Sequence, residues 1–252
     1  MSIRSVLCVF AHPDDETILA GGILALLHTQ GVQTHLICAT SGEGGEIGDP
    51  PIVEDRRELG AARGEELRCA AEALGVSTLT LLGYVDPDIG PGEELRPFEA
   101  HFPTLVQQIA QLITERKTEA VLTHGPDGEY GHPAHRLLYQ AARKAVVQHH
   151  PQALLYSVAA TVPGHEDHLW NASRTAHLAL NITPWAEAKI AAMECHVSQH
   201  ALFKRRRKLQ TVREALRRIE SVHREWPPVH DGPPDDAFAA LLRAAGAQDV
   251  EN

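Results

Sequence analysis

The sequence is poor in aromatic residues and has no long apolar run. Only 5% of its 252 residues are Phe, Trp or Tyr, which leaves little material for a surface that stacks nucleic acid bases. A formal net charge of −10 opposes binding to phosphate backbones and anionic lipid, because lysine and arginine chiefly hold such partners. No stretch approaches the roughly 18 apolar residues of a membrane span or resembles a signal peptide. We therefore expect a cytoplasmic protein that binds neither nucleic acid nor a membrane.

Cysteine is also scarce. The four cysteines, Cys8, Cys38, Cys69 and Cys195, show no Cys-x-x-Cys spacing. Each falls in a predicted strand or helix where a small apolar residue would pack. We expect four core thiols in a reducing compartment, and a disulfide between Cys8 and Cys38 on neighbouring predicted strands is the alternative.

Short apolar runs alternate with longer helical patterns along the chain. The predicted strands are 5–10, 33–39, 78–82, 120–123 and 154–160. The predicted helices are 17–30, 53–74, 98–116, 133–149 and one or two more across 185–223. This alternation indicates an α/β fold, a three-layer α/β/α sandwich with a mainly parallel, Rossmann-like sheet. We expect residues 1–252 to form a single domain, in which the proline-rich segment 226–234 is a linker to a short C-terminal helix.

Two polar clusters follow predicted strands. Ala-His-Pro-Asp-Asp-Glu, residues 11–16, comes directly after strand 5–10, and Tyr-Gly-His-Pro-Ala-His, residues 130–135, follows strand 120–123. The carboxyl ends of parallel strands are where α/β proteins hold their ligands. His and Asp side chains suit a zinc-like ion, and ferrous iron is a competitor for two histidines and one carboxylate. The two clusters together predict one catalytic metal site.

These two motifs resemble the signature of the LmbE/PIG-L family of zinc-dependent deacetylases, which includes the mycothiol and bacillithiol pathway enzymes. The likeness extends to Arg-Gly-Glu-Glu-Leu at 63–67, Leu-Gly at 74–75, Leu-Gly-Tyr-Val-Asp at 82–86, and Lys189 with His-Val-Ser-Gln at 196–199. The resemblance implies removal of an N-acetyl group from an N-acetylglucosamine-type conjugate. It also implies metal ligation by His12, Asp15 and His135, with Asp14 as general base. Adjacent residues point in different directions, which agrees with separate roles for the two aspartates.

Further roles are implied for residues of the second motif. By resemblance, His132 would stand as an imidazolium near the oxyanion and serve as a general acid, and Tyr130 would donate a hydrogen bond there. The family often has an aspartate where this chain has Ala134. Alanine cannot stabilise a charged His132, so Asp127 or Glu129 would have to replace that carboxylate.

The resemblance also points to contacts with the sugar. Arg63 and Asp86 would bind substrate hydroxyls or an attached anionic group, although both residue types also occur on solvated surfaces and in turns. The implied partner is a small amino-sugar conjugate, and a homo-oligomer is compatible with the family. Two other functions stay open at this point: cleavage of another amide, such as that of a thiol conjugate, and metal-dependent sugar binding without turnover.

Other polar residues have secondary roles in this scheme. We expect Glu16 to favour the start of a helix or to support a ligand, and His124 to pack beside the site rather than to catalyse. The glycine-rich loop 41–51 is either a substrate lid or a surface connection.

Overall fold

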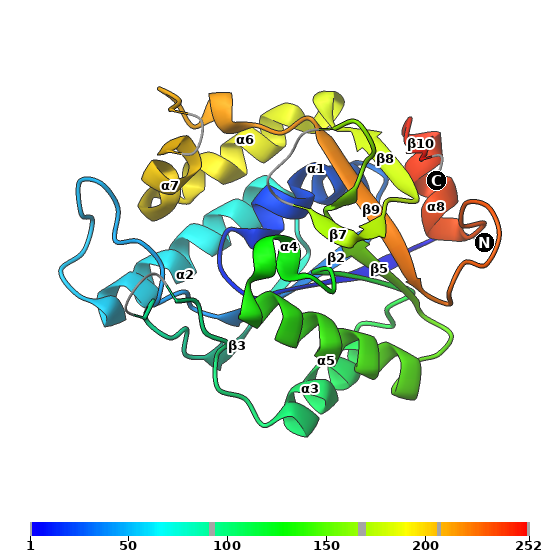
Figure 1. The fold of residues 1–252 in the computed structure, drawn as a ribbon, viewed down its shortest axis with the longest axis horizontal. Helices are drawn as coiled ribbons and strands as arrows, with labels where there is room; N and C mark the ends of the chain where they lie inside the picture. The colour runs from blue at the N-terminus through cyan, green and yellow to red at the C-terminus, as the bar shows by residue number, and fades with distance from the viewer. Residues whose placement is uncertain (1, 91–93, 166–169, 206–207, 251–252) are drawn as a thin grey trace.

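One large sheet forms the centre of the computed structural model, which describes residues 2–90, 94–165, 170–205 and 208–250 (Figure 1). In spatial order its strands are β10 (Gln248–Asp249), β8 (Leu178–Asn181), β9 (Ile219–Trp226), β5 (Leu154–Val158), β4 (Ala120–Thr123), β1 (Ser5–Phe10), β2 (Gln33–Thr40) and β3 (Thr78–Tyr84). Strands β3, β2, β1, β4 and β5 are parallel, whereas β9, β8 and β10 pair antiparallel at one side. The mainly parallel, Rossmann-like sheet predicted from the sequence is confirmed.

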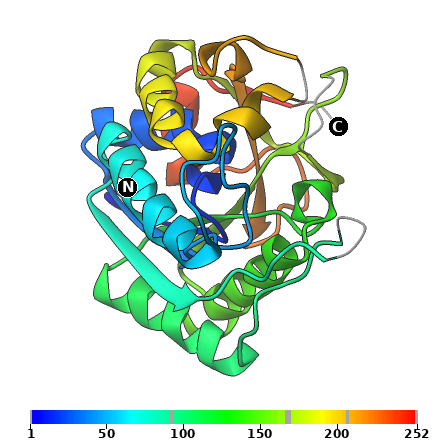
Figure 2. The ribbon, with the colours of Figure 1, turned by 90° about the vertical axis from the view of Figure 1, so that its left-hand side faces the viewer.

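Helices cover both faces of this sheet. One face carries α1 (Asp15–Thr29), α2 (Arg56–Ala73), α6 (Ala186–Cys195) and α8 (Ala237–Ala244), and the other carries α3 (Phe102–Glu115) and α5 (Pro133–His149). Figure 2 shows the two layers on opposite sides of the strands. Strand β1 is buried along its whole length, because its alternate residues pack into the two cores on either side. Among the described residues, no helix combines the length and apolar character that a membrane crossing requires.

Short elements complete the chain. They are the helices α4 (Gly128–Gly131) and α7 (His200–Arg205), the 3-10 turns η1 (Thr183–Trp185), η2 (Val197–Gln199) and η3 (Arg213–Ala215), and a two-stranded sheet of β6 (Ala160–Thr161) and β7 (Asn171–Thr175).

The antiparallel side of the sheet differs from the prediction. The sequence predicts one or two helices across 185–223, and α6 and α7 lie there, but β9 begins at Ile219 within the same range, and Trp226 ends this strand. Its polar and charged residues hide the strand pattern in the sequence. The predicted strand 154–160 divides at Ala159, whose φ of 51° is incompatible with a continuous strand. The short C-terminal helix is confirmed as α8.

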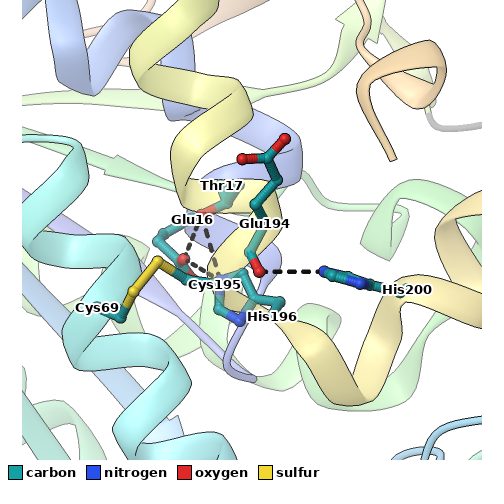
Figure 3. Close-up of a disulfide and its surroundings, with 7 residues drawn as sticks. All are labelled: Glu16, Thr17, Cys69, Glu194, Cys195, His196 and His200. Carbon is teal, nitrogen blue, oxygen red and sulfur yellow. Dashed lines mark hydrogen bonds and ion pairs between the residues drawn. A yellow bond between two sulfur atoms is a disulfide. The ribbon is translucent and has the colours of Figure 1, made fainter. Parts of the chain in front are cut away.

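The prediction of four free thiols is wrong for two of them. Cys69 on α2 and Cys195 at the end of α6 form a disulfide with a Cα–Cα distance of 5.7 Å, as Figure 3 shows. Cys8 and Cys38 are buried free thiols, so the alternative pairing between them is also wrong. The sequence gives no sign of a pairing between residues 126 positions apart. Because such cross-links are rare in the cytosol, cysteine usage no longer supports a reducing compartment.

Candidate metal centre

The three ligands implied by the resemblance lie together at the carboxyl ends of β1 and β4. His12 and Asp15 belong to the loop after β1 and the start of α1, and His135 lies in the first turn of α5. His12 Nδ1 is 3.3 Å from Asp15 Oδ2 and 3.2 Å from His135 Nε2, and His135 Nε2 is 3.4 Å from Asp15 Oδ2. All three residues are buried. This edge is also the point where the strand order of the parallel sheet reverses, a usual place for a ligand.

The spacing of these ligand atoms fits a tetrahedral cation. Ligands held about 2.0–2.1 Å from zinc in a tetrahedron stand about 3.3–3.4 Å apart. Right-angled ligation at the same bond length would bring them to about 2.9 Å. The observed triangle of 3.2, 3.3 and 3.4 Å matches the tetrahedral value. Two imidazoles and one carboxylate therefore offer three corners of such a site.

Two further carboxylates orient the histidine ligands. Glu129 Oε2 accepts from His135 Nδ1, which turns Nε2 of that ring toward the other ligands. Asp86 Oδ1 lies 3.3 Å from His12 Nε2, the ring nitrogen opposite the ligating one. Carboxylate–histidine pairs of this kind fix the tautomer of a metal-binding imidazole. Burial lowers the pKa of His12, but Asp86 and Asp15 more than offset this effect and raise it to about 9.

Glu129 occupies this position because of an unusual local backbone. Its φ of 59° is rare for a residue with a side chain. Asn171 at the start of β7 holds the turn, because its Oδ1 accepts from Glu129 N at 3.1 Å and its Nδ2 donates to Glu129 Oε1 at 3.2 Å. Sequence reasoning missed Asn171, since nothing local distinguishes it from a surface asparagine.

His124 supports the same cluster of proposed ligands through contacts with Glu129 and His135. Its Nε2 accepts from Ala11 N at 3.0 Å, and its Nδ1 lies 3.0 Å from Glu129 Oε2. Its ring stacks on His135 at a centroid distance of 3.9 Å. His124 can also be grouped with Asp15 and His135 as a metal-binding set. Since both of its nitrogens already have protein partners, a supporting position describes it better.

Asp14 stands beside the ligands without joining their triangle. It immediately precedes α1 and has φ 110°, and its backbone N donates to Glu16 Oε2 at 3.0 Å. Its Oδ2 lies 3.4 Å from Arg63 Nη2. Burial raises the pKa of Asp14, Arg63 lowers it and Asp15 raises it again, with a net value of about 6. A carboxylate of that pKa can both accept and release a proton near neutrality.

Arg63 links two loops of the site. Its guanidinium donates to Pro13 O and, at 2.8 Å, to Gly42 O, and its side chain is only 3% exposed. A Cβ at Gly42 would lie 2.4 Å from Nη1, so the glycine makes room for the arginine. Arg63 therefore holds these two loops together and helps to fix the position of Asp14.

Glu16 supports Asp14 from the other side. Its Oε2 accepts from Asp14 N, and its Oε1 lies 2.9 Å from His196 Nε2 (Figure 3). Both side chains are fully buried, and His196 directly follows the disulfide-bonded Cys195. The role of Glu16 goes beyond that of a charge at a helix N-terminus.

His132 and Tyr130 face the ligands from the second motif. The His132 ring stacks on His135 at 4.4 Å, and its Nδ1 accepts from Ala134 N at 3.2 Å. Burial and the neighbouring His135 and His12 lower the pKa of His132 to about 2. Tyr130 is 47% exposed, and its ring meets the edge of His132 at 5.7 Å.

The carboxylates proposed as partners for His132 are engaged elsewhere. Glu129 holds His124 and His135, and Asp127 Oδ2 accepts from Ser173 N at 2.7 Å. In the described part of the chain no carboxylate hydrogen-bonds to His132. The geometry therefore favours a neutral imidazole with its hydrogen on Nε2.

A cavity of about 500 Å³, called the polar cavity here because most residues of its wall are charged or polar, opens beside the ligands. Its wall includes Asp86, Arg96 and Gln199 together with part of the loop 41–51. Glu46 holds this loop in place, because its carbonyl accepts from Gln199 Nε2 and its carboxylate pairs with Arg205. The loop is thus a wall of the cavity.

The chain is similar to deacetylases in sequence. The family model "PIG-L: GlcNAc-PI de-N-acetylase" matches residues 7–146. The 1D-myo-inositol 2-acetamido-2-deoxy-alpha-D-glucopyranoside deacetylase of Corynebacterium glutamicum (strain R) is 34% identical over 171 residues, which are 63% of this chain and 57% of the relative. The protein of the same name from Mycobacteroides abscessus is 30% identical over 230 residues, 79% of this chain and 82% of the relative. The chain spans little more than half the length of the first of these relatives.

Solved structures share the fold at lower identity. GalB, the 4-carboxy-2-hydroxymuconate hydratase of Pseudomonas putida KT2440, superposes with a TM-score of 0.63 at 24% identity, over 92% of this chain and 100% of that one. The N,N'-diacetylchitobiose deacetylase of Pyrococcus horikoshii gives 0.59 at 22% identity, over 78% of this chain and 70% of that one. These likenesses concern the fold alone. Because the family model matches more than half of the sequence and the mycobacterial relative is 30% identical over most of it, the chain belongs to the PIG-L family.

Proposed function

We propose that the protein is a metal-dependent hydrolase that removes the N-acetyl group from an N-acetylglucosamine-type sugar conjugate. The observation that carries this proposal is the triangle of His12, Asp15 and His135 ligand atoms beside a separate buried carboxylate, Asp14. The relatives are named as deacetylases of an acetamido sugar, which supports the same substrate class here. The tetrahedral spacing of the ligands supports zinc over ferrous iron.

The reaction consumes one water for each amide cleaved. The water oxygen forms a bond to the acyl carbon, the carbon–nitrogen bond breaks, and the products are acetate and a protonated amine. A divalent cation at this site supplies a Lewis acid, which acidifies water and polarises an amide carbonyl.

Asp14 is suited to move the protons. In its ionised form it accepts a proton from the attacking water, and a pKa of about 6 lets it give that proton up again to the departing nitrogen. Arg63 and Glu16 fix its position through the contacts described above. A rigid base is what such a transfer requires, since a displacement of 1 Å can cost about a hundredfold in rate.

His132 and Tyr130 complete the proposal at the carbonyl oxygen. A neutral His132 with hydrogen on Nε2 can donate to the oxygen as negative charge develops, and the Tyr130 hydroxyl can donate from the mouth of the site. Arg63 and Asp86 would then act mainly as positioning residues for Asp14 and His12, although Asp86 also faces the polar cavity where the sugar would bind.

The test is amine release from a panel of N-acetylglucosamine conjugates by the zinc-loaded and the iron-loaded protein. Turnover of one or more conjugates supports the proposal. Turnover only of a thiol-conjugate amide would replace it by the related amidase function. Binding of the sugars without release of amine would leave a metal-dependent sugar-binding protein.

A further inference from the structure

We propose that the site accepts amides whose acyl group is apolar and longer than acetyl, up to about six carbons, in a pocket separate from the sugar cavity. This inference rests on the proposed function and concerns the part of the substrate that is released as the acid.

Two cavities meet at the ligand cluster. Asp14, Asp15, Tyr130 and Leu202 belong to the walls of both. Beyond them, most residues in the wall of the larger cavity are charged or polar, whereas most of those in the wall of the smaller one are apolar: Ile18, Leu19, Met193, Phe203 and Ala215. An amide carbonyl held between the cavities carries one substituent on each side. The polar cavity suits the hydroxyl-rich amine half, so the acyl half faces the apolar pocket.

The charged residues in this wall do not make it an anion site. Lys189 is buried, and its ammonium group is 2.6 Å from Glu220 Oε1 and donates to Ile18 O at 3.0 Å. It therefore presents its methylene groups to the pocket. Arg217 is half-buried in the same wall and is likewise engaged with a partner.

The size of the pocket indicates the length of the chain. Its volume is about 150 Å³, and an apolar cavity of about 150 Å³ is large enough for benzene, a group of six carbons. The methyl group of an acetamide would leave most of it unfilled. Each further methylene that is buried there would raise kcat/KM by about fourfold.

Much of the pocket wall lies outside the family match. Met193 on α6, Leu202 and Phe203 on α7, and Ala215 in η3 all follow residue 146, where the match ends. The pocket is thus built largely by a part of the chain that the matched motifs do not determine. Acyl preference can differ here while the ligand cluster stays the same.

The direct test is kcat/KM of the zinc-loaded protein for glucosamine carrying acetyl, butanoyl, hexanoyl, decanoyl or adipoyl groups. We expect hexanoyl to exceed acetyl by more than tenfold, with decanoyl and the carboxylate-ended adipoyl well below hexanoyl. Turnover in which acetyl or adipoyl is preferred would overturn the pocket and leave the deacetylase proposal intact. Absence of turnover on every member would overturn both.

A pair of variants locates the effect. Ala215→Phe places a ring in the pocket, and Ala201→Phe makes the same change at another half-buried alanine, which lines neither cavity. We expect the hexanoyl-to-acetyl ratio of kcat/KM to fall more than tenfold in the first variant alone. This ratio does not depend on the fraction of folded protein. Equal ratios in both variants would overturn the assignment.

A binding measurement gives a readout that needs no turnover. With the base removed by Asp14→Asn, calorimetry on the zinc-loaded protein should give a Kd at least tenfold lower for N-hexanoylglucosamine than for N-acetylglucosamine. Equal affinities would contradict an apolar acyl site.

Discussion

Replacing Asp86 by asparagine distinguishes two roles for this residue: support of the proposed ligand His12, and contact with the sugar. The substitution keeps the size of the side chain and removes the charge that lies 3.3 Å from His12 Nε2. The two atoms are close, but the geometry at His12 Nε2 falls short of a well-aligned hydrogen bond. Loss of such an orienting carboxylate typically weakens metal binding 10- to 100-fold, which corresponds to about 1.4–2.7 kcal/mol.

The assay is competition for zinc against a chromogenic chelator, at neutral pH, for the native protein and two variants. Asp86→Asn should raise the zinc Kd within that range. The matched control is Asp88→Asn, because Asp88 is 70% exposed and pairs only across the surface with Arg56 at 3.2 Å. It should leave the Kd within about twofold of the native value. An unchanged zinc Kd in Asp86→Asn with a raised KM would refute the reasoning and return Asp86 to a pure sugar contact.

Three further predictions concern the surroundings of the site. Asn171→Ala should weaken zinc binding by about tenfold, because Glu129 loses its support; an unchanged Kd in the same competition assay would contradict this. Cys69→Ser should lower the free energy of unfolding by about 2–5 kcal/mol in urea titrations, and equal stability of variant and native protein under oxidising conditions would argue against the cross-link. Burial and the neighbouring His223 lower the pKa of His177 to about 4, whereas an unfolded histidine titrates near 6.5. The unfolded state therefore binds the proton first, and stability should fall as the pH drops from 6.5 to 4. In His177→Asn the urea midpoint should change less with pH over that range, and a pH dependence equal to that of the native protein would contradict this prediction.

The parallel half of the fold could be read from the sequence. Strands 5–10 and 120–123 and helix 133–149 occur within the predicted bounds, because compact apolar runs and a proline at the helix start leave little choice. The antiparallel strands β8 and β9 were missed. β8 has only four residues, and most residues of β9 are polar or charged, so neither shows a strand pattern; their pairing depends on partners far along the chain.

The grouping of the three proposed ligands could be predicted for a different reason. His12 and Asp15 are close in sequence, and the two motifs come after strands that neighbour each other in the sheet, the first directly and the second after a short loop. Glu129 was considered only as a partner for His132, since the turn that aims it at His135 depends on a positive φ and on Asn171. Long-range support of this kind leaves no local pattern.

The fold alone does not determine the reaction. A hydratase and a deacetylase both superpose on this chain at low identity. The proposed chemistry therefore depends on the site, where three ligand atoms and a separate base are brought together.

The central claim is that His12, Asp15 and His135 hold a catalytic metal while Asp14 acts as the base. The most direct measurement determines zinc content and acetamide turnover together in Asp14→Asn and Asp15→Asn. We predict that Asp14→Asn keeps its zinc and loses about 10²- to 10⁴-fold in rate, whereas Asp15→Asn loses both metal and activity. Native turnover in Asp14→Asn, or native zinc affinity in Asp15→Asn, would contradict the account.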